Sequence, residues 1–111
     1  MTDPATVAFR TIASGDAVAE GLVVPFYLKD RKRRVAIARV GGQVRAFDDL
    51  CTCAGEACPL SGGLLTLTTI LCQCHGSEFD IVSGAVVWGP ATRRLDVHAV
   101  QETDGVIQVR L

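Results

Sequence analysis

The chain has 111 residues, of which 49% are hydrophobic, 21% charged and 5% aromatic, with a formal net charge of −1. This length supports one domain with its own core, expected to span residues 1–111, and is too short for two domains of ordinary size. The near-zero net charge gives no general attraction to nucleic acid or to anionic membranes, and neither is expected as a partner.

No segment approaches the roughly 20 uninterrupted apolar residues of a membrane-spanning helix. Residues 1–8 lack the charged start and the apolar stretch of a secretory signal. We therefore expect a cytoplasmic protein.

The first half of the chain predicts a β-hairpin. Residues 33–40 and 43–47 have the alternating apolar character of strands, and Gly41-Gly42 between them suits a tight turn. Before this hairpin, residues 16–20 are compatible with a single helical turn that ends at Gly21.

Two cysteine-bearing loops interrupt the strand pattern between residues 48 and 76. The first opens at Cys51-Thr52-Cys53 and is rich in Gly, Pro and Ser, and the second opens at Cys72-Gln73-Cys74-His75. One short strand, over residues 66–71, is expected between them. All five cysteines fall within this region, which favours a metal site over the dispersed disulfides of a secreted domain.

Further strands are predicted in the last third of the chain, at residues 78–82, 85–88, 95–100 and 106–111. Ser83-Gly84 and Asp104-Gly105 supply turn signals between them. Because no long window shows a helical period, the expected fold class is all-β.

The chemistry is predicted to lie on the two loops, which carry a Cys-x-Cys pair and a Cys-x-x-His pair. Each pair stands beside a strand end, so neighbouring strands can bring both pairs to one site. Thiolate sulfur and imidazole nitrogen are the ligands that soft and borderline metals prefer.

These motifs resemble the Rieske family, whose signature is Cys-x-His followed by Cys-x-x-His. The similarity covers residues 7–111 and includes segments 46–52, 58–63 and 72–80. It implies an antiparallel β sandwich with a small cluster-binding subdomain, whose loops lie at about 48–63 and 72–80. It also implies a [2Fe-2S] cluster as the cofactor.

The resemblance assigns ligands residue by residue. Cys51 and Cys72 match the two thiolates on one iron, and His75 matches an imidazole on the other. Cys53 stands where the family has its first histidine, so the expected ligand set is Cys51, Cys53, Cys72 and His75. The first loop is also slightly longer than usual, which leaves Cys58 as the alternative to Cys53.

Other positions of the motif bear on the cluster's surroundings. Cys58 and Cys74 match cysteines that form a disulfide in high-potential respiratory relatives, and we favour this bond over two buried thiols. Ser77 matches a serine that donates a hydrogen bond to a cluster sulfur, whereas Phe79 replaces a tyrosine and cannot donate. A third thiolate adds negative charge, so we expect a lower reduction potential than that of a two-histidine cluster.

The resemblance implies a soluble one-electron carrier rather than an enzyme. Its expected partners are a flavin-dependent ferredoxin reductase and a terminal oxygenase, either a ring-hydroxylating Rieske enzyme or a haem-thiolate monooxygenase. Two alternatives stay open: a structural or redox-sensing domain that binds zinc through three thiolates and one imidazole, and a small subunit docked to a larger reductase.

Several surface predictions complete the interpretation. The basic stretch 29–34 fits a docking patch for an acidic redox partner or for nucleic acid, but a solvated turn is the favoured interpretation. His98 is expected to be an ordinary strand residue, and Trp88 to pack in the core or in a loop. Leu60 and Pro90, beside the histidine ligand, are expected to form a docking surface.

Overall fold

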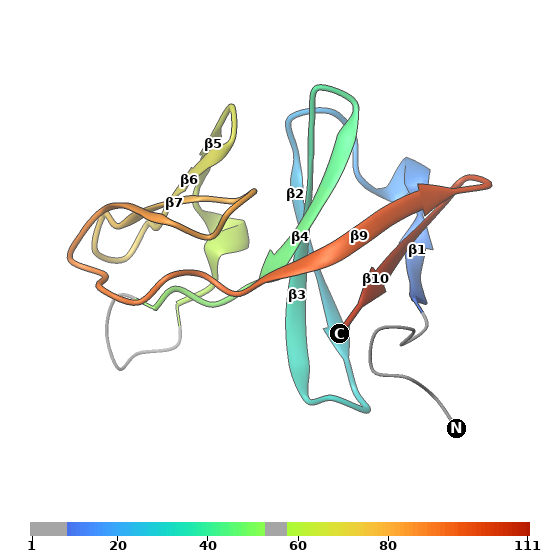
Figure 1. Ribbon diagram of the computed structural model, residues 1–111, viewed down its shortest axis with the longest axis horizontal. Coiled ribbons are helices and arrows are strands. Elements are labelled where there is room, and N and C mark those ends of the chain that lie inside the picture. The colour runs from blue at the N-terminus through green and yellow to red at the C-terminus, as the bar shows by residue number, and fades with distance from the viewer. Residues whose placement is uncertain (1–8, 53–57) are drawn as a thin grey trace.

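The computed structural model describes residues 9–52 and 58–111, which form two antiparallel sheets placed side by side (Figure 1). The larger sheet has six strands in the order β1-β10-β9-β4-β3-β2, and the smaller has four in the order β5-β6-β7-β8. The all-β prediction is confirmed. Within the described ranges, no helix is long and apolar enough to cross a membrane.

The elements of the larger sheet are β1 (Arg10–Ser14), β2 (Val23–Leu28), β3 (Arg33–Val40), β4 (Gln43–Asp48), β9 (Val97–Thr103) and β10 (Val106–Arg110). Those of the smaller sheet are β5 (Leu64–Thr66), β6 (Thr69–Leu71), β7 (Glu78–Asp80) and β8 (Val86–Trp88). Two short 3₁₀ helices are described, η2 (Gly15–Ala17) and η3 (Leu60–Gly62).

The predicted hairpin is present as β3 and β4, paired in register from Val35↔Asp48 to Val40↔Gln43. Gly41 and Gly42 form its turn with φ angles of 61° and 79°, a left-handed conformation that glycine adopts without a steric penalty. The helical turn predicted at residues 16–20 is present as the 3₁₀ helix η2 (Gly15–Ala17), which starts one residue earlier and ends three residues earlier than predicted.

Strand β3 is buried on both faces. One face packs within the larger sheet and the other packs against the cysteine loops. Side chains alternate between the faces of a strand. Val35 and Ile37 pack into one core together with Ile107 of β10, so the larger sheet folds over itself. Ala36 and Ala38 face a second core, which also contains the cysteines at positions 51, 58 and 72. The loops are therefore seated on a rigid strand.

The smaller sheet differs from the prediction at residues 66–71, which was expected to be one strand. The chain instead forms the hairpin of β5 and β6, with register Leu64↔Leu71 and Thr66↔Thr69. Its turn places Leu67 at φ 53°, a conformation that bulky residues rarely adopt. The Thr69 hydroxyl donates to the Thr66 carbonyl across the turn, at 2.9 Å. No Gly, Asn or Pro marks this turn in the sequence, so the single-strand prediction was wrong.

Candidate metal centre

The first cysteine loop begins where β4 ends at Asp48. Cys51 is buried, and its amide donates a 2.8 Å hydrogen bond to the carbonyl of Cys58. This bond holds the two ends of the loop together. Residues 53–57 lie outside the described part of the chain, so the assignment of Cys53 as a ligand stays a prediction.

A buried carboxylate clamps this loop from both sides. One oxygen of Asp49 accepts from the Ser61 amide at 2.6 Å, and the other accepts from the Ser61 hydroxyl at 2.8 Å. The second oxygen also lies 2.7 Å from Nε of Arg34 on β3, and the Asp49 side chain is 0% exposed. The Asp49 amide in turn donates to the Arg34 carbonyl at 3.0 Å. The residues before and after the loop are thereby tied to one another and to β3.

The second cysteine loop is the tight connection between β6 and β7. The Cys72 amide donates to the Ser77 carbonyl at 2.7 Å, and the Gly76 amide donates to the Cys72 carbonyl at 3.0 Å. Gly76 has φ 79°, so the reversal requires the freedom of glycine. Cys72 is buried at the base of this turn, while His75 is exposed at its tip.

The two loops are joined covalently, because Cys58 and Cys74 form a disulfide as predicted. The Cys72 sulfur lies 3.6 Å from that of Cys58, and the sulfurs of Cys58, Cys72 and Cys74 all lie within 4.8 Å of one another. A sulfur in a disulfide is not a thiolate, so Cys58 does not fit the role of an iron ligand in this structure. This favours Cys53 for that role.

A third loop packs against the second through Ser77, which is fully buried. The amide of Ala91, which follows Gly89-Pro90, donates to the Ser77 hydroxyl oxygen at 3.0 Å. Because the oxygen acts as the acceptor here, the hydroxyl hydrogen remains available to another acceptor. Phe79, also 0% exposed, packs in the same core as Cys51 and Cys72.

Two predictions about side-chain exposure need correction. Leu60 is completely buried in the core beneath the loops, because it is the first residue of η3, which Asp49 anchors through Ser61. Trp88 is 67% exposed on β8 rather than packed. Pro90 is exposed, as the predicted docking surface requires.

Comparison with known proteins identifies this arrangement. Residues 9–102 match the family model of the Rieske [2Fe-2S] domain. The chain belongs to this family. The ferredoxin component of the naphthalene 1,2-dioxygenase/salicylate 5-hydroxylase systems of Ralstonia sp. is 31% identical over 86 residues, 78% of this chain and 79% of that protein. Ferredoxin CarAc of Metapseudomonas resinovorans is 37% identical over 75 residues, 68% of each chain.

Solved structures agree with the sequence relatives. The Sphingomonas yanoikuyae B1 ferredoxin superimposes with a TM-score of 0.83 at 26% identity, covering 94% of this chain and 99% of that one. A chain in the complex of reduced oxygenase and oxidized ferredoxin in carbazole 1,9a-dioxygenase also gives 0.83 at 26% identity, covering 95% and 94%. The predicted Rieske-type fold is confirmed.

The cofactor of a Rieske domain is a [2Fe-2S] cluster, and the donors of the described loops fit it. Cys51 and Cys72 place two sulfurs in a buried position, one from each loop. His75 places an imidazole at the surface end of the second loop. Buried thiolates on one iron and an outward imidazole on the other are the arrangement of this cluster type.

A Ser77→Ala variant is expected to lower the reduction potential. A hydroxyl that donates to cluster sulfur stabilises the reduced, more negative state. Loss of one such charge-assisted bond is worth about 1.5 kcal/mol, which for a one-electron couple is roughly 60 mV. Voltammetry of the purified variant measures it, with Ser83→Ala as the control, since the Ser83 hydroxyl only accepts from the Ala85 amide in an exposed turn. An unchanged potential in Ser77→Ala would show that the hydroxyl does not reach the cluster.

Proposed function

We propose that this chain is a one-electron carrier of an oxygenase system. It receives electrons from a flavin-dependent ferredoxin reductase and passes them to a terminal oxygenase, either a ring-hydroxylating Rieske enzyme or a haem-thiolate monooxygenase. The observation that carries the proposal is the pair of clamped cysteine loops, buried at the sulfurs and open to the surface at His75. Relatives that are ferredoxin components of dioxygenase systems support the same role.

The cluster supplies the one-electron redox chemistry, and the chain provides its ligands and its rigidity. The proposed ligands are Cys51, Cys53, Cys72 and His75. The disulfide and the Asp49 clamp hold both loops in place, so little of the protein has to move when its charge changes. The exposed imidazole of His75 gives the electron a short path to a docked partner.

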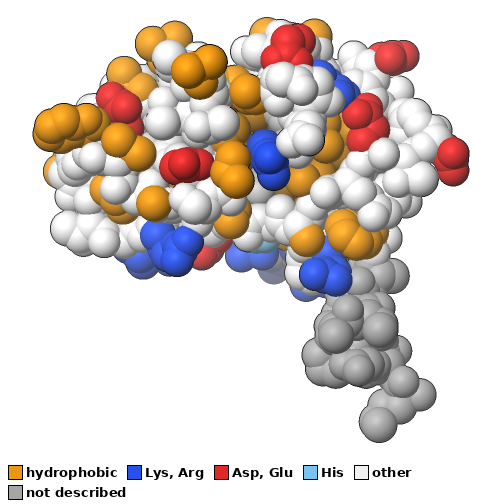
Figure 2. Space-filling model, turned by 45° about the horizontal axis from the view of Figure 1, so that its top comes forward, with side chains coloured by type: hydrophobic (Ala, Val, Ile, Leu, Met, Phe, Trp, Pro, Cys, Tyr) orange, Lys and Arg blue, Asp and Glu red, His pale blue; other side chains and the backbone are white. Residues whose placement is uncertain are grey.

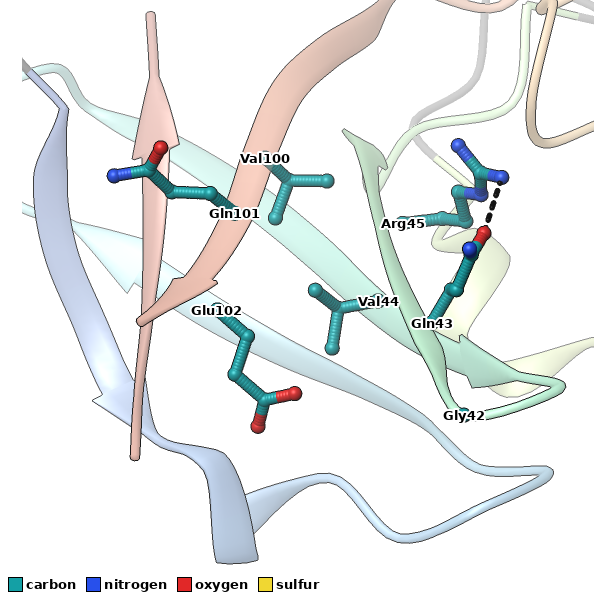
Figure 3. A pocket seen from close by; sticks show the side chains of 7 residues that line it. All are labelled: Gly42, Gln43, Val44, Arg45, Val100, Gln101 and Glu102. Carbon is teal, nitrogen blue, oxygen red and sulfur yellow. Dashed lines mark hydrogen bonds between the residues drawn. The ribbon is translucent and has the colours of Figure 1, made fainter. Parts of the chain in front are cut away.

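The chain is a carrier and not itself an enzyme, a role supported by relatives that are ferredoxin components of dioxygenase systems. Figure 3 shows a hollow between β4 and β9, lined by residues 42–45 and 100–102. It lies where the two strands diverge, beyond their paired positions Ala46↔His98 and Phe47↔Val97. Its charged lining residues are Arg45 and Glu102.

The spectra and metal content of anaerobically purified protein test the proposal. We expect a coloured protein with iron and acid-labile sulfide in equal amounts, and a paramagnetic signal that appears on one-electron reduction. A colourless protein that contains zinc would establish the structural or redox-sensing alternative. A folded protein with neither metal would favour the small subunit of a larger reductase.

We also propose a cytoplasmic location. The cysteines cluster in the two cluster loops instead of being spread along the chain. The disulfide found among the described residues joins these loops, with Cys58 buried and Cys74 exposed. Burial of Cys58 shields one of the two sulfurs from attack by a thiolate, which helps the bond to persist in a reducing compartment.

A further inference from the structure

Basic side chains gather on one edge of the molecule. Figure 2 shows Lys and Arg mainly along the lower edge of its view, and Asp and Glu mainly over the upper and right parts. We define the basic band as Arg10, which is paired with Asp30 of the β2–β3 turn, together with the cations of that turn, of the start of β3 and of the segment after Pro90: Lys29, Arg31, Lys32, Arg33, Arg34, Arg93 and Arg94. Five of the eight come from the β2–β3 turn and the start of β3, and two come from the segment that follows Pro90.

The two parts of the basic band meet at the first cluster loop. Arg34 is paired with Asp49, two residues before Cys51. On the other side, the hydroxyl of Thr52, the residue after Cys51, donates to the Arg93 carbonyl. The two segments that carry these basic residues therefore lie on either side of a proposed cluster ligand.

The charge of the described residues is strongly polarised. The eight cations of the basic band are interleaved with four carboxylates, and each of these is paired with a cation of the band: Asp30 with Arg10, Asp48 with Arg33, Asp49 with Arg34 and Asp96 with Arg93. The rest of the described chain carries three arginines and six acidic side chains. Among the described residues, the basic band therefore has an excess of positive charge and the remainder an excess of negative charge.

A hollow lies within this positive side. It is lined by Lys32, Arg33 and Arg34, by the paired carboxylates of Asp48 and Asp49, and by Leu50. Leu50 is 43% exposed at the mouth of the first loop. The site therefore offers surplus positive charge around one apolar side chain, which is the complement of an acidic protein surface with an apolar contact at its centre.

We propose that the basic band is the surface on which a redox partner with an acidic face docks, a proposal that rests on the electron-carrier function above. Charge of this kind steers the encounter and raises association rates by one to three orders of magnitude at low salt. The carboxylates interspersed in the band favour a protein, whose surface carries both signs of charge, over a phosphate backbone. The band also continues to the Pro90 loop through Arg93, so a partner docked there reaches the cluster side of the molecule.

The rate at which small charged complexes oxidise the reduced protein tests the electrostatic field at the basic band. Ferricyanide and hexaamminecobalt(III) carry opposite charges, and their rates are followed by stopped-flow absorbance at low and high salt. Lys32→Glu and Arg93→Glu each change the charge of the basic band by two units. Arg45→Glu, on β4 in the hollow of Figure 3, makes the same change outside the band and is the matched control.

At low salt we expect both band variants to react with ferricyanide about threefold or more slowly than wild type, and faster with hexaamminecobalt(III). Arg45→Glu should stay within about twofold of wild type, and salt well above 0.1 M should remove the differences because it shortens the Debye length. Equal effects of all three variants would overturn the proposal, because only net charge would then count.

Binding of polyanions distinguishes the two classes of partner. Poly-glutamate is expected to shift the amide resonances of residues 29–34 and 93–94 in wild type but not in Lys32→Glu. Shifts caused by duplex DNA but not by poly-glutamate would overturn the proposal in favour of nucleic acid. This titration needs no electron transfer, so a protein without a reducible cluster would refute the carrier function and leave the docking test intact.

Discussion

A Cys53→His variant is expected to keep a [2Fe-2S] cluster and to raise its reduction potential by on the order of 100 mV or more. The reason is charge: a neutral imidazole in place of a thiolate makes both redox states less negative by one unit, which favours uptake of an electron in a partly desolvated site. The change also restores the family's two-histidine ligand set. Voltammetry of the purified variant and of wild type measures the shift.

Serine substitutions provide the controls for this prediction. Cys53→Ser is expected to lose most of its cluster, because it removes a proposed ligand. Cys58→Ser and Cys74→Ser both open the same disulfide, so they should retain the cluster and resemble one another. Cluster loss in Cys58→Ser alone, with Cys53→Ser intact, would show that Cys58 is the ligand and that the first loop is arranged differently.

The sequence predicted those parts of the fold whose signals are local. Gly41-Gly42 marked the turn of the β3–β4 hairpin, because a two-residue turn with positive φ selects glycine. The β5–β6 hairpin was missed because Leu67 takes a similar left-handed conformation without any such signal. Strands β1 and β2 are not among the predicted elements, and their pairing with β10 and β3 is what fixes them in the sheet.

The site shows the same division between local and distant signals. The two motifs pointed to a metal site on the cysteine loops, and the family resemblance supplied the proposed ligands and the disulfide. The Asp49 clamp joins residues 12 positions apart, and Nε2 of His98 lies 2.7 Å from Asp48, a residue 50 positions away. His98 lies in strand β9 as predicted, but no local sequence pattern identifies Asp48 as its partner. The basic stretch 29–34 could be placed beside the first loop only once β3 and β4 were paired.

An Asp49→Ala variant is expected to lose about 2–4 kcal/mol of stability, because it leaves the part-buried amide of Ser61 without its acceptor and removes the partner of Arg34. For a domain of this size the loss corresponds to a fall in Tm of roughly 10 °C or more. Thermal unfolding of the cluster-loaded protein, followed by circular dichroism at fixed conditions, measures it. Asp49→Asn keeps an acceptor for the Ser61 amide and should fall between the variant and wild type.

Asp30→Ala is the matched comparison for this clamp. Asp30 also pairs with an arginine, at 2.8 Å from Arg10, but its side chain is 58% exposed. Exposed pairs contribute little, about 0–1 kcal/mol, because water and salt screen them. Equal Tm values for Asp49→Ala and Asp30→Ala would contradict the prediction, because burial of Asp49 would then not strengthen its pair with Arg34. If Asp49→Ala alone also bleached its visible absorbance faster than wild type below the melting transition, the carboxylate would be shown to hold the first loop around the cluster and not merely to stabilise the fold.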